Sequence, residues 1–313
     1  MTIRVRFRNA PTHYLSPESL LARIVSTAMS DAVEIVRERN STVDVEFVTD
    51  PLGALAFAAK HTANLSARRS PRVGRAIRRL DPTATLSPDS SARASFWFTG
   101  ENVRPPVGDW DGYFSFDIDS LSGRNAYLPL WFETVGALNC SAHSFTRRAV
   151  TVSEALLPRP FASGERPGFM CAFIGNMTRW REQAISTFSE VGVVDVFGAS
   201  SGRPVPDKSA IASRYRYVLC FENDLYPGYV TEKPFEAWAS GATPVWWGSD
   251  PLGYVNPSAL LNAAAPGGLE GIADVIAARE SDGAPLLPQA HAILTRPPDL
   301  EPSIALIKQA LAR

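Results

Sequence analysis

The stretch YRYVLCFENDLYPGYVTEKPFEAWASGATPVWWGSD, residues 215–250, decides the fold class of this chain. An apolar run typical of a buried strand ends in the polar letters FEN, and a short loop containing Pro and Gly follows. A segment with helical spacing then begins at TEK and ends at a Gly before a second apolar strand, TPVWWGS. Strands that alternate with helices in this way predict parallel strands joined by right-handed crossovers.

The same alternation extends over both halves of the chain, so we expect an α/β protein with parallel sheets. Apolar or alternating runs predict strands at residues 2–8, 32–36, 43–48, 95–100, 113–118, 169–175, 193–198, 215–223 and 243–249. Helical spacing predicts helices at residues 16–29, 178–191, 207–214, 231–241, 268–281 and 301–313. The first helix is expected to start with Ser16 as its N-cap and Pro17 as its first residue.

A segment rich in Pro, Gly and Ser, residues 150–168, marks the expected boundary between two domains. A chain of 313 residues is long enough for two separate cores. We therefore predict an N-terminal domain over 1–155, a C-terminal domain over 156–295, and a terminal helix within 296–313 that could pack back on the N-terminal domain.

Composition restricts the partners and the compartment. The net charge of −1 excludes a broad electrostatic surface for nucleic acid. The three cysteines are far apart and lack zinc-binding spacing, which indicates buried thiols in a reducing compartment. The first residues alternate like a strand instead of forming a signal peptide, and no window approaches the ~18 apolar residues of a membrane span. We expect a cytoplasmic protein. The basic stretch 67–80 is either a solvated face or a region attracted to an anionic membrane surface or acceptor.

Polar residues gather where the first strand of the opening stretch ends and its helix begins. Ligands of parallel α/β sheets bind beyond the carboxyl ends of the strands, which places Glu222 and Asn223 near such a crevice. Thr231 is the expected N-cap, and free N–H groups at a helix start favour phosphate. Lys233 adds a movable positive charge, and Glu232 adds an acceptor suited to ribose hydroxyls. These residues favour a nucleotide site, although a capped helix with a surface Glu–Lys pair would show the same letters.

Residues 215–249 also resemble the signature of the α1,3/4-fucosyltransferases, in particular the bacterial α1,3 enzymes. Members of that family carry a stretch of the form Y-[KR]-[FY]-x-L-[CA]-F-E-N, then Y-[VI]-T-E-K and a strand like TPVWWGS. A second block, FWFTGENVRPP…DGYFSFDID…YLPLWF (96–132), resembles the family's N-terminal signature, and VTDPLG (48–53) is a weaker third match.

The resemblance implies the GT-B architecture, in which two Rossmann-like domains with parallel sheets face each other across a cleft. It also implies an inverting transfer of L-fucose from GDP-fucose to an oligosaccharide hydroxyl, expected at O3 of a GlcNAc-type or LacNAc-type residue in α1,3 linkage. The C-terminal domain would bind GDP-fucose, and the N-terminal domain the acceptor. The alternatives are a different nucleotide-sugar donor on the same scaffold and a non-catalytic glycan-binding or nucleotide-binding protein. The acceptor, α1,3 against α1,4 linkage, the oligomeric state and weak attachment to the bacterial inner membrane stay open.

An inverting displacement needs a base that takes the proton of the attacking hydroxyl. The family pattern falls on Glu101 of FTGEN, just past an expected strand. Asp109, Asp117 and Asp119 compete with it, and DWD and DID are formally DxD patterns of the kind that hold Mn²⁺ in another glycosyltransferase fold. Because such short patterns are weak signals, we expect no metal site and no required cofactor, and leave open a stimulating divalent cation.

The departing diphosphate needs positive charge. The resemblance assigns Lys233 to it, together with an arginine after the first strand of the C-terminal domain. Arg181 and Arg179 compete for that second role, and the apolar positions that follow Arg181 favour it. The resemblance further implies that Glu232 binds the ribose and that Asn223 and Tyr229 contact the diphosphate or the fucose.

Overall fold

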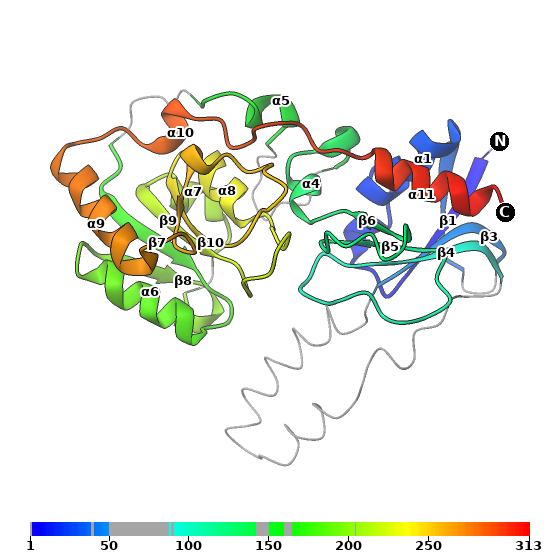
Figure 1. The fold of residues 1–313 in the computed structure, drawn as a ribbon, viewed down its shortest axis with the longest axis horizontal. Helices are drawn as coiled ribbons and strands as arrows, with labels where there is room; N and C mark the ends of the chain where they lie inside the picture. Colours follow the sequence, from blue (N-terminus) through cyan, green and yellow to red (C-terminus); the bar gives the residue numbers. More distant parts are fainter. Residues whose placement is uncertain are drawn as a thin grey trace, which may run out of the picture. The chain divides into compact units, whose positions relative to one another are not determined.

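The computed structural model describes residues 2–38, 41–49, 88, 91–141, 150–159, 165–203 and 205–313. The basic stretch 67–80 and residues 50–53 of the weakest family match lie outside these residues. The chain divides into two compact units, one formed by Met1–Leu128 with Asp299–Arg313 and the other by Pro129–Pro298 (Figure 1). The division therefore falls before the segment rich in Pro, Gly and Ser, and the terminal helix belongs to the first unit.

The first unit is built on a six-stranded parallel sheet of order β2-β1-β3-β4-β5-β6. Its strands are β1 (Thr2–Arg8), β2 (Ala32–Val36), β3 (Val43–Val48), β4 (Ala92–Phe98), β5 (Gly112–Ser115) and β6 (Asn125–Tyr127). Arg6 of β1 is buried although it is charged, and its guanidinium forms an ion pair of 2.8 Å with the fully buried Glu46 of β3.

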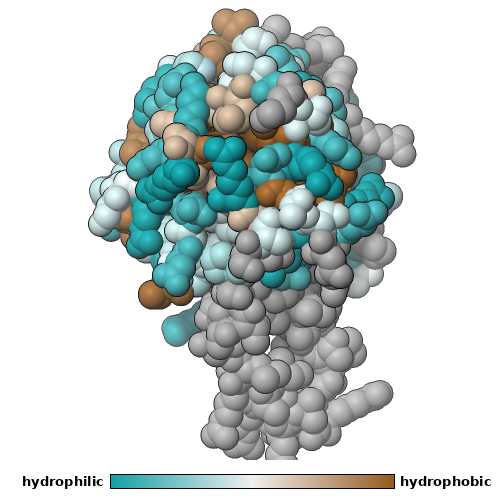
Figure 2. All heavy atoms as spheres, turned by 90° about the vertical axis from the view of Figure 1, so that its right-hand side faces the viewer, coloured by the Kyte–Doolittle hydropathy of each residue, from teal (hydrophilic) through white to brown (hydrophobic). Residues whose placement is uncertain are grey.

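Two helices of the first unit, α1 (Leu20–Met29) and α11 (Glu301–Leu311), lie side by side although they come from opposite ends of the chain (Figure 1). The cap of α1 is Ser19, whose hydroxyl accepts a hydrogen bond from Ala22 N, so the expected cap Ser16 is wrong. The Ser16 hydroxyl accepts from Glu18 N in a turn that precedes the helix. On the surface of this unit, hydrophilic residues cover much of the visible described part, with hydrophobic residues between them (Figure 2).

The second unit contains a five-stranded parallel sheet of order β11-β10-β9-β7-β8. Its strands are β7 (Gly168–Phe173), β8 (Val194–Phe197), β9 (Tyr215–Phe221), β10 (Thr243–Trp247) and β11 (Leu261–Asn262). Its helices are α4 (Trp131–Thr134), α5 (Val152–Ala155), α6 (Arg179–Ser189), α7 (Lys208–Ala212), α8 (Lys233–Ala239), α9 (Gly268–Ser281) and α10 (Leu287–Ala290). Two separate sheets of parallel strands confirm the α/β class.

The central strand β9 packs against helices on both of its faces. Tyr217, Leu219 and Phe221 alternate along β9 and join the core formed with α6 and α9. Val218 and Cys220 alternate with them along the strand and so lie on the opposite face. The helices α7 and α8 also contact β9. None of the helices in the described ranges combines the length and the hydropathy needed to span a bilayer.

Candidate functional site

The carboxylate of Glu222, directly after β9, organises the site in the second unit. Its side chain is 0% exposed and meets four donors. Oε1 accepts from Thr231 N at 2.9 Å and from Trp246 Nε1 at 3.3 Å. Oε2 accepts from Thr231 Oγ1 at 2.7 Å and from Lys233 Nζ at 3.2 Å. All acceptor directions of this buried carboxylate are therefore in use, which fixes the loop between β9 and α8.

This network corrects the expected helix cap. Thr231 does not cap α8, because its backbone N–H and its hydroxyl both donate to Glu222. The helix begins after Glu232, which makes no side-chain cap, and Pro234 in the first turn has no N–H to offer.

Lys233 lies between two carboxylates. Its ammonium donates to Thr231 Oγ1 at 2.8 Å and forms ion pairs with Glu222 at 3.2 Å and Glu232 at 3.6 Å, while 24% of its side chain is exposed. Burial alone would lower the pKa of Lys233, but these two carboxylates raise it above the ordinary value. Burial likewise opposes ionisation of Glu232, yet Lys233 and Lys208 lower its pKa below the ordinary value. Both groups therefore carry their charges near neutral pH.

Arg181 lies in the first turn of α6, whose cap is the Thr178 hydroxyl. Its guanidinium donates to the carbonyl oxygens of Asn176 and Phe221, both at 2.9 Å, and to Asn223 Oδ1 at 3.0 Å. Arg181 is only 7% exposed, and this burial lowers its pKa. The competing Arg179 is exposed and does not line the pocket described below.

Asn223 links Arg181 to Tyr229. Its Oδ1 accepts from the guanidinium, and its Nδ2 donates to the Tyr229 hydroxyl at 3.4 Å. Tyr229 is buried at 1% exposure, whereas Asn223 is exposed. The amide can therefore reach a ligand from solvent while the tyrosine orients it.

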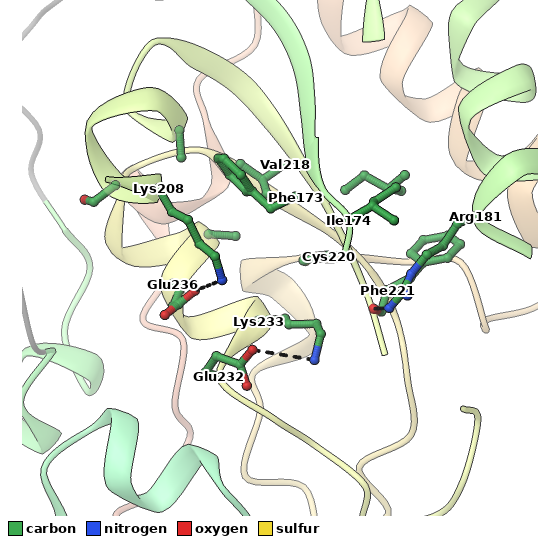
Figure 3. Close-up of a pocket in the computed structure, with 14 residues that line it drawn as sticks. Phe173, Ile174, Arg181, Lys208, Val218, Cys220, Phe221, Glu232, Lys233 and Glu236 are labelled. Carbon is green, nitrogen blue, oxygen red and sulfur yellow. Dashed lines mark hydrogen bonds and ion pairs between the residues drawn. The ribbon is translucent and has the colours of Figure 1, made fainter. Parts of the chain in front are cut away.

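Of these groups, Arg181, Glu232 and Lys233 line one pocket of the second unit, with an empty volume of about 600 Å³ that includes its open mouth (Figure 3). The lining residues are Phe173, Ile174, Arg181, Lys208, Ser209, Ala212, Val218, Leu219, Cys220, Phe221, Glu232, Lys233, Glu236 and Ala237. Sequence reasoning did not find Lys208 and Glu236, whose side chains form an ion pair of 3.5 Å. For Glu236 the sequence offered one signal, its position four residues after Glu232, which places the two carboxylates on one helix face.

Glu101 follows β4 at the carboxyl edge of the sheet in the first unit and is exposed. Its backbone N–H donates to Thr99 Oγ1 at 3.1 Å, which holds the turn that carries the side chain. The competitors Asp117 and Asp119 accept hydrogen bonds from backbone N–H groups two residues further on. Within the described residues, no group of three or more His, Cys, Asp or Glu side chains could hold a metal ion.

Comparison with known proteins finds a family match within the second unit. Residues 165–265 match the family described as glycosyltransferase family 10 (fucosyltransferase) C-terminal. The chain is 25% identical over 190 residues to the α-(1,3)-fucosyltransferase FucT of Helicobacter pylori, and the match covers 53% of this chain and 40% of that protein. The matched part of this chain thus spans well under two thirds of the length of this curated relative.

Solved structures of α1,3-fucosyltransferases share the fold. One crystal structure matches with a TM-score of 0.68 at 19% identity and covers 100% of this chain and 90% of the other. A crystal structure with GDP-fucose matches with a TM-score of 0.65 at 17% identity and covers 100% and 91%. Residues 165–265 are therefore similar to the C-terminal domain of glycosyltransferase family 10, on a chain with the fold of the α1,3-fucosyltransferase crystal structures.

Proposed function

We propose that this protein is an α1,3-fucosyltransferase that takes L-fucose from GDP-fucose. The observation that carries the proposal is the pocket in which Arg181, Glu232 and Lys233 meet, because it lies within the residues that match family 10. A relative in Helicobacter pylori is an α-(1,3)-fucosyltransferase, and a structurally similar α1,3-fucosyltransferase was crystallised with GDP-fucose.

The second unit is the proposed donor domain. The guanidinium of Arg181 offers a planar fork of donors suited to phosphate oxygens, and the ammonium of Lys233 adds a point charge. Both would stabilise the negative charge that develops on the diphosphate as it leaves. Glu232 would accept from a ribose hydroxyl, and Asn223 with Tyr229 behind it would contact the diphosphate or the fucose.

The first unit is the proposed acceptor domain, and Glu101 is its proposed base. Its exposed carboxylate would accept the proton of the acceptor hydroxyl as that oxygen attacks the anomeric carbon of fucose. The new C–O bond forms while the bond to the phosphate oxygen breaks, and the electron pair leaves with GDP. One displacement inverts the anomeric carbon, through an oxocarbenium-like transition state such as glycoside hydrolysis shows. We place the attacking hydroxyl at O3 of a GlcNAc-type residue.

Thermal unfolding with a panel of nucleotides tests the donor. GDP and GDP-fucose should stabilise the protein, and a ligand at ~100 times its Kd adds about 2.7 kcal/mol to the free energy of unfolding. A response to UDP-galactose alone would exclude the donor assignment. A stronger response to GDP-mannose than to GDP-fucose would identify another donor sugar on the same scaffold.

Transfer to an array of oligosaccharide acceptors, with labelled GDP-fucose, tests catalysis. We expect label on GlcNAc-type or LacNAc-type acceptors, and we expect Glu101→Gln to abolish it while GDP affinity stays near that of the wild type. Asp109→Asn is the matched control, because it removes a competing carboxylate of the same segment. Persistent transfer by Glu101→Gln would assign the base to another residue, and GDP binding without transfer to any acceptor would leave a nucleotide-binding protein.

A further inference from the structure

The pocket contains a charged pair that lies away from Arg181, one of the residues proposed to bind the diphosphate. Lys208 and Glu236 lie on the side of the pocket away from Arg181, and Phe173, Val218 and Ile174 lie between them (Figure 3). The two ends of the pocket therefore differ in chemistry. At one end Arg181 presents a cation that is hydrogen-bonded to neutral oxygens, while the other end presents a cation and a carboxylate side by side.

The pair is set into the wall of the pocket. The Nζ of Lys208 lies 3.5 Å from Oε2 of Glu236, and their side chains are 28% and 10% exposed. The charge of Lys208 also lowers the pKa of Glu232, so Lys208 lies close both to Glu236 of α8 and to Glu232 just before that helix. A carboxylate with so little exposure carries a desolvation penalty unless it is paired, and an ion pair in such a place contributes little to net stability. A ligand that uses both members of the pair gives it another role.

A guanine base matches the pair in both sign and position. The Watson–Crick edge of guanine carries an acceptor, O6, beside two donors, N1–H and the exocyclic N2 amino group. A carboxylate can accept from both donors at once, and a neighbouring ammonium can donate to O6. Adenine has a donor at position 6 and an acceptor at N1. It would therefore place a donor opposite the ammonium and an acceptor opposite the carboxylate. The apolar side chains of Phe173, Val218 and Ala212 suit the faces of a flat ring.

We propose that Glu236 and Lys208 read the Watson–Crick edge of the guanine base, and so select the nucleotide of the donor. Glu236 accepts from N1–H and N2–H of the base, and Lys208 donates to O6. This inference rests on the proposed function, because it assumes that the pocket binds a guanine nucleotide with its diphosphate toward Arg181 and Lys233.

Inosine diphosphate isolates one contact, because hypoxanthine lacks the N2 amino group and keeps N1–H and O6. We would titrate GDP and IDP into the full chain by calorimetry, for the wild type and for Glu236→Gln, Lys208→Met and Glu182→Gln. Glu182→Gln is the matched control, since Glu182 is exposed on α6 and does not line the pocket. A good bidentate contact to a base discriminates by about tenfold or more, so the wild type should prefer GDP over IDP by at least that factor.

The four proteins should then separate in a fixed pattern. Glu182→Gln should keep the wild-type preference, and Glu236→Gln should reduce it to within about threefold, mainly through weaker GDP binding. Lys208→Met should weaken GDP and IDP by about tenfold alike, because both bases present O6. Equal affinity of the wild type for GDP and IDP, or an unchanged preference in Glu236→Gln, would overturn the inference and leave the proposed function standing. Absence of any GDP binding by the wild type would overturn both.

Discussion

Replacing Glu222 by glutamine tests the network that fixes the proposed diphosphate site. The substitution keeps the shape of a side chain that is 0% exposed and removes its charge. An amide nitrogen at the position of Oε1 would face the N–H donors of Thr231 and Trp246, and at the position of Oε2 it would face the ammonium of Lys233. In either orientation at least one buried donor meets another donor.

Breaking a buried ion pair destabilises proteins by about 3–5 kcal/mol. Lys233 keeps a second carboxylate, Glu232 at 3.6 Å, and its side chain is 24% exposed, so part of its solvation can be recovered. We therefore expect a loss at the lower end, about 3 kcal/mol of the free energy of unfolding, for Glu222→Gln. Such a loss is a large share of the ~5–15 kcal/mol that stabilises a typical domain.

Urea unfolding of wild type and variant, followed by far-ultraviolet circular dichroism, measures the change from the transition midpoint at constant slope. Glu190→Gln at the exposed end of α6 is the control, and it should stay within about 0.5 kcal/mol of the wild type. The double variant Glu222→Gln with Lys233→Met should lose less than the sum of its single variants, because no ammonium remains to be stranded. A loss below about 1 kcal/mol for Glu222→Gln, or strict additivity in the cycle, would refute the reasoning.

Three further changes probe the proposed phosphate ligand, a glycine and a buried phenol. Arg181→Lys loses the planar fork and should weaken GDP binding by about tenfold or more in calorimetry, while Arg179→Lys should not. Gly198→Ala should destabilise by more than about 1 kcal/mol in thermal unfolding, because φ is 103° and a Cβ would lie 2.6 Å from the Ile174 carbonyl oxygen. Burial raises the pKa of Tyr217 from 10.0 to about 12, so its stabilising contribution is complete below pH 10.0 and is lost as the pH rises to about 12. Tyr217→Phe should flatten that alkaline loss in a pH series of unfolding free energies.

The alternation of strands and helices was enough to predict the fold class, because parallel sheets bury their strands as apolar runs that sequence shows directly. The ranges 32–36 and 43–48 agree with β2 and β3 at both ends. The strand β6 and the short helices α4 and α10 were not predicted, since each has at most four residues and no period can be read from so few.

The wrong predictions of the helix caps have a different cause. Ser16 and Thr231 both look like N-caps in the local sequence, but Ser19 and a contact to Glu222 take their places. At Thr231, the local preference for a cap is worth about 1 kcal/mol, which the buried carboxylate of Glu222 in need of donors outweighs. Lys208 and Glu236 come from two helices that only the folded chain brings together, so no local pattern could have paired them.

The balance of charge in the pocket bears on how it could bind an anion. Lys233 forms ion pairs with both Glu222 and Glu232, and Lys208 forms one with Glu236. In the described part of the chain, the hydrogen bonds of Arg181 go only to neutral oxygens. Among the described residues, Arg181 is thus a lining cation that makes no direct hydrogen bond to a carboxylate. Burial lowers its pKa, the charge of nearby Glu222 acts against that shift, and burial strengthens the field of the guanidinium. A diphosphate would gain most of its new attraction there, while Lys233 would have to be shared with carboxylates that already hold it.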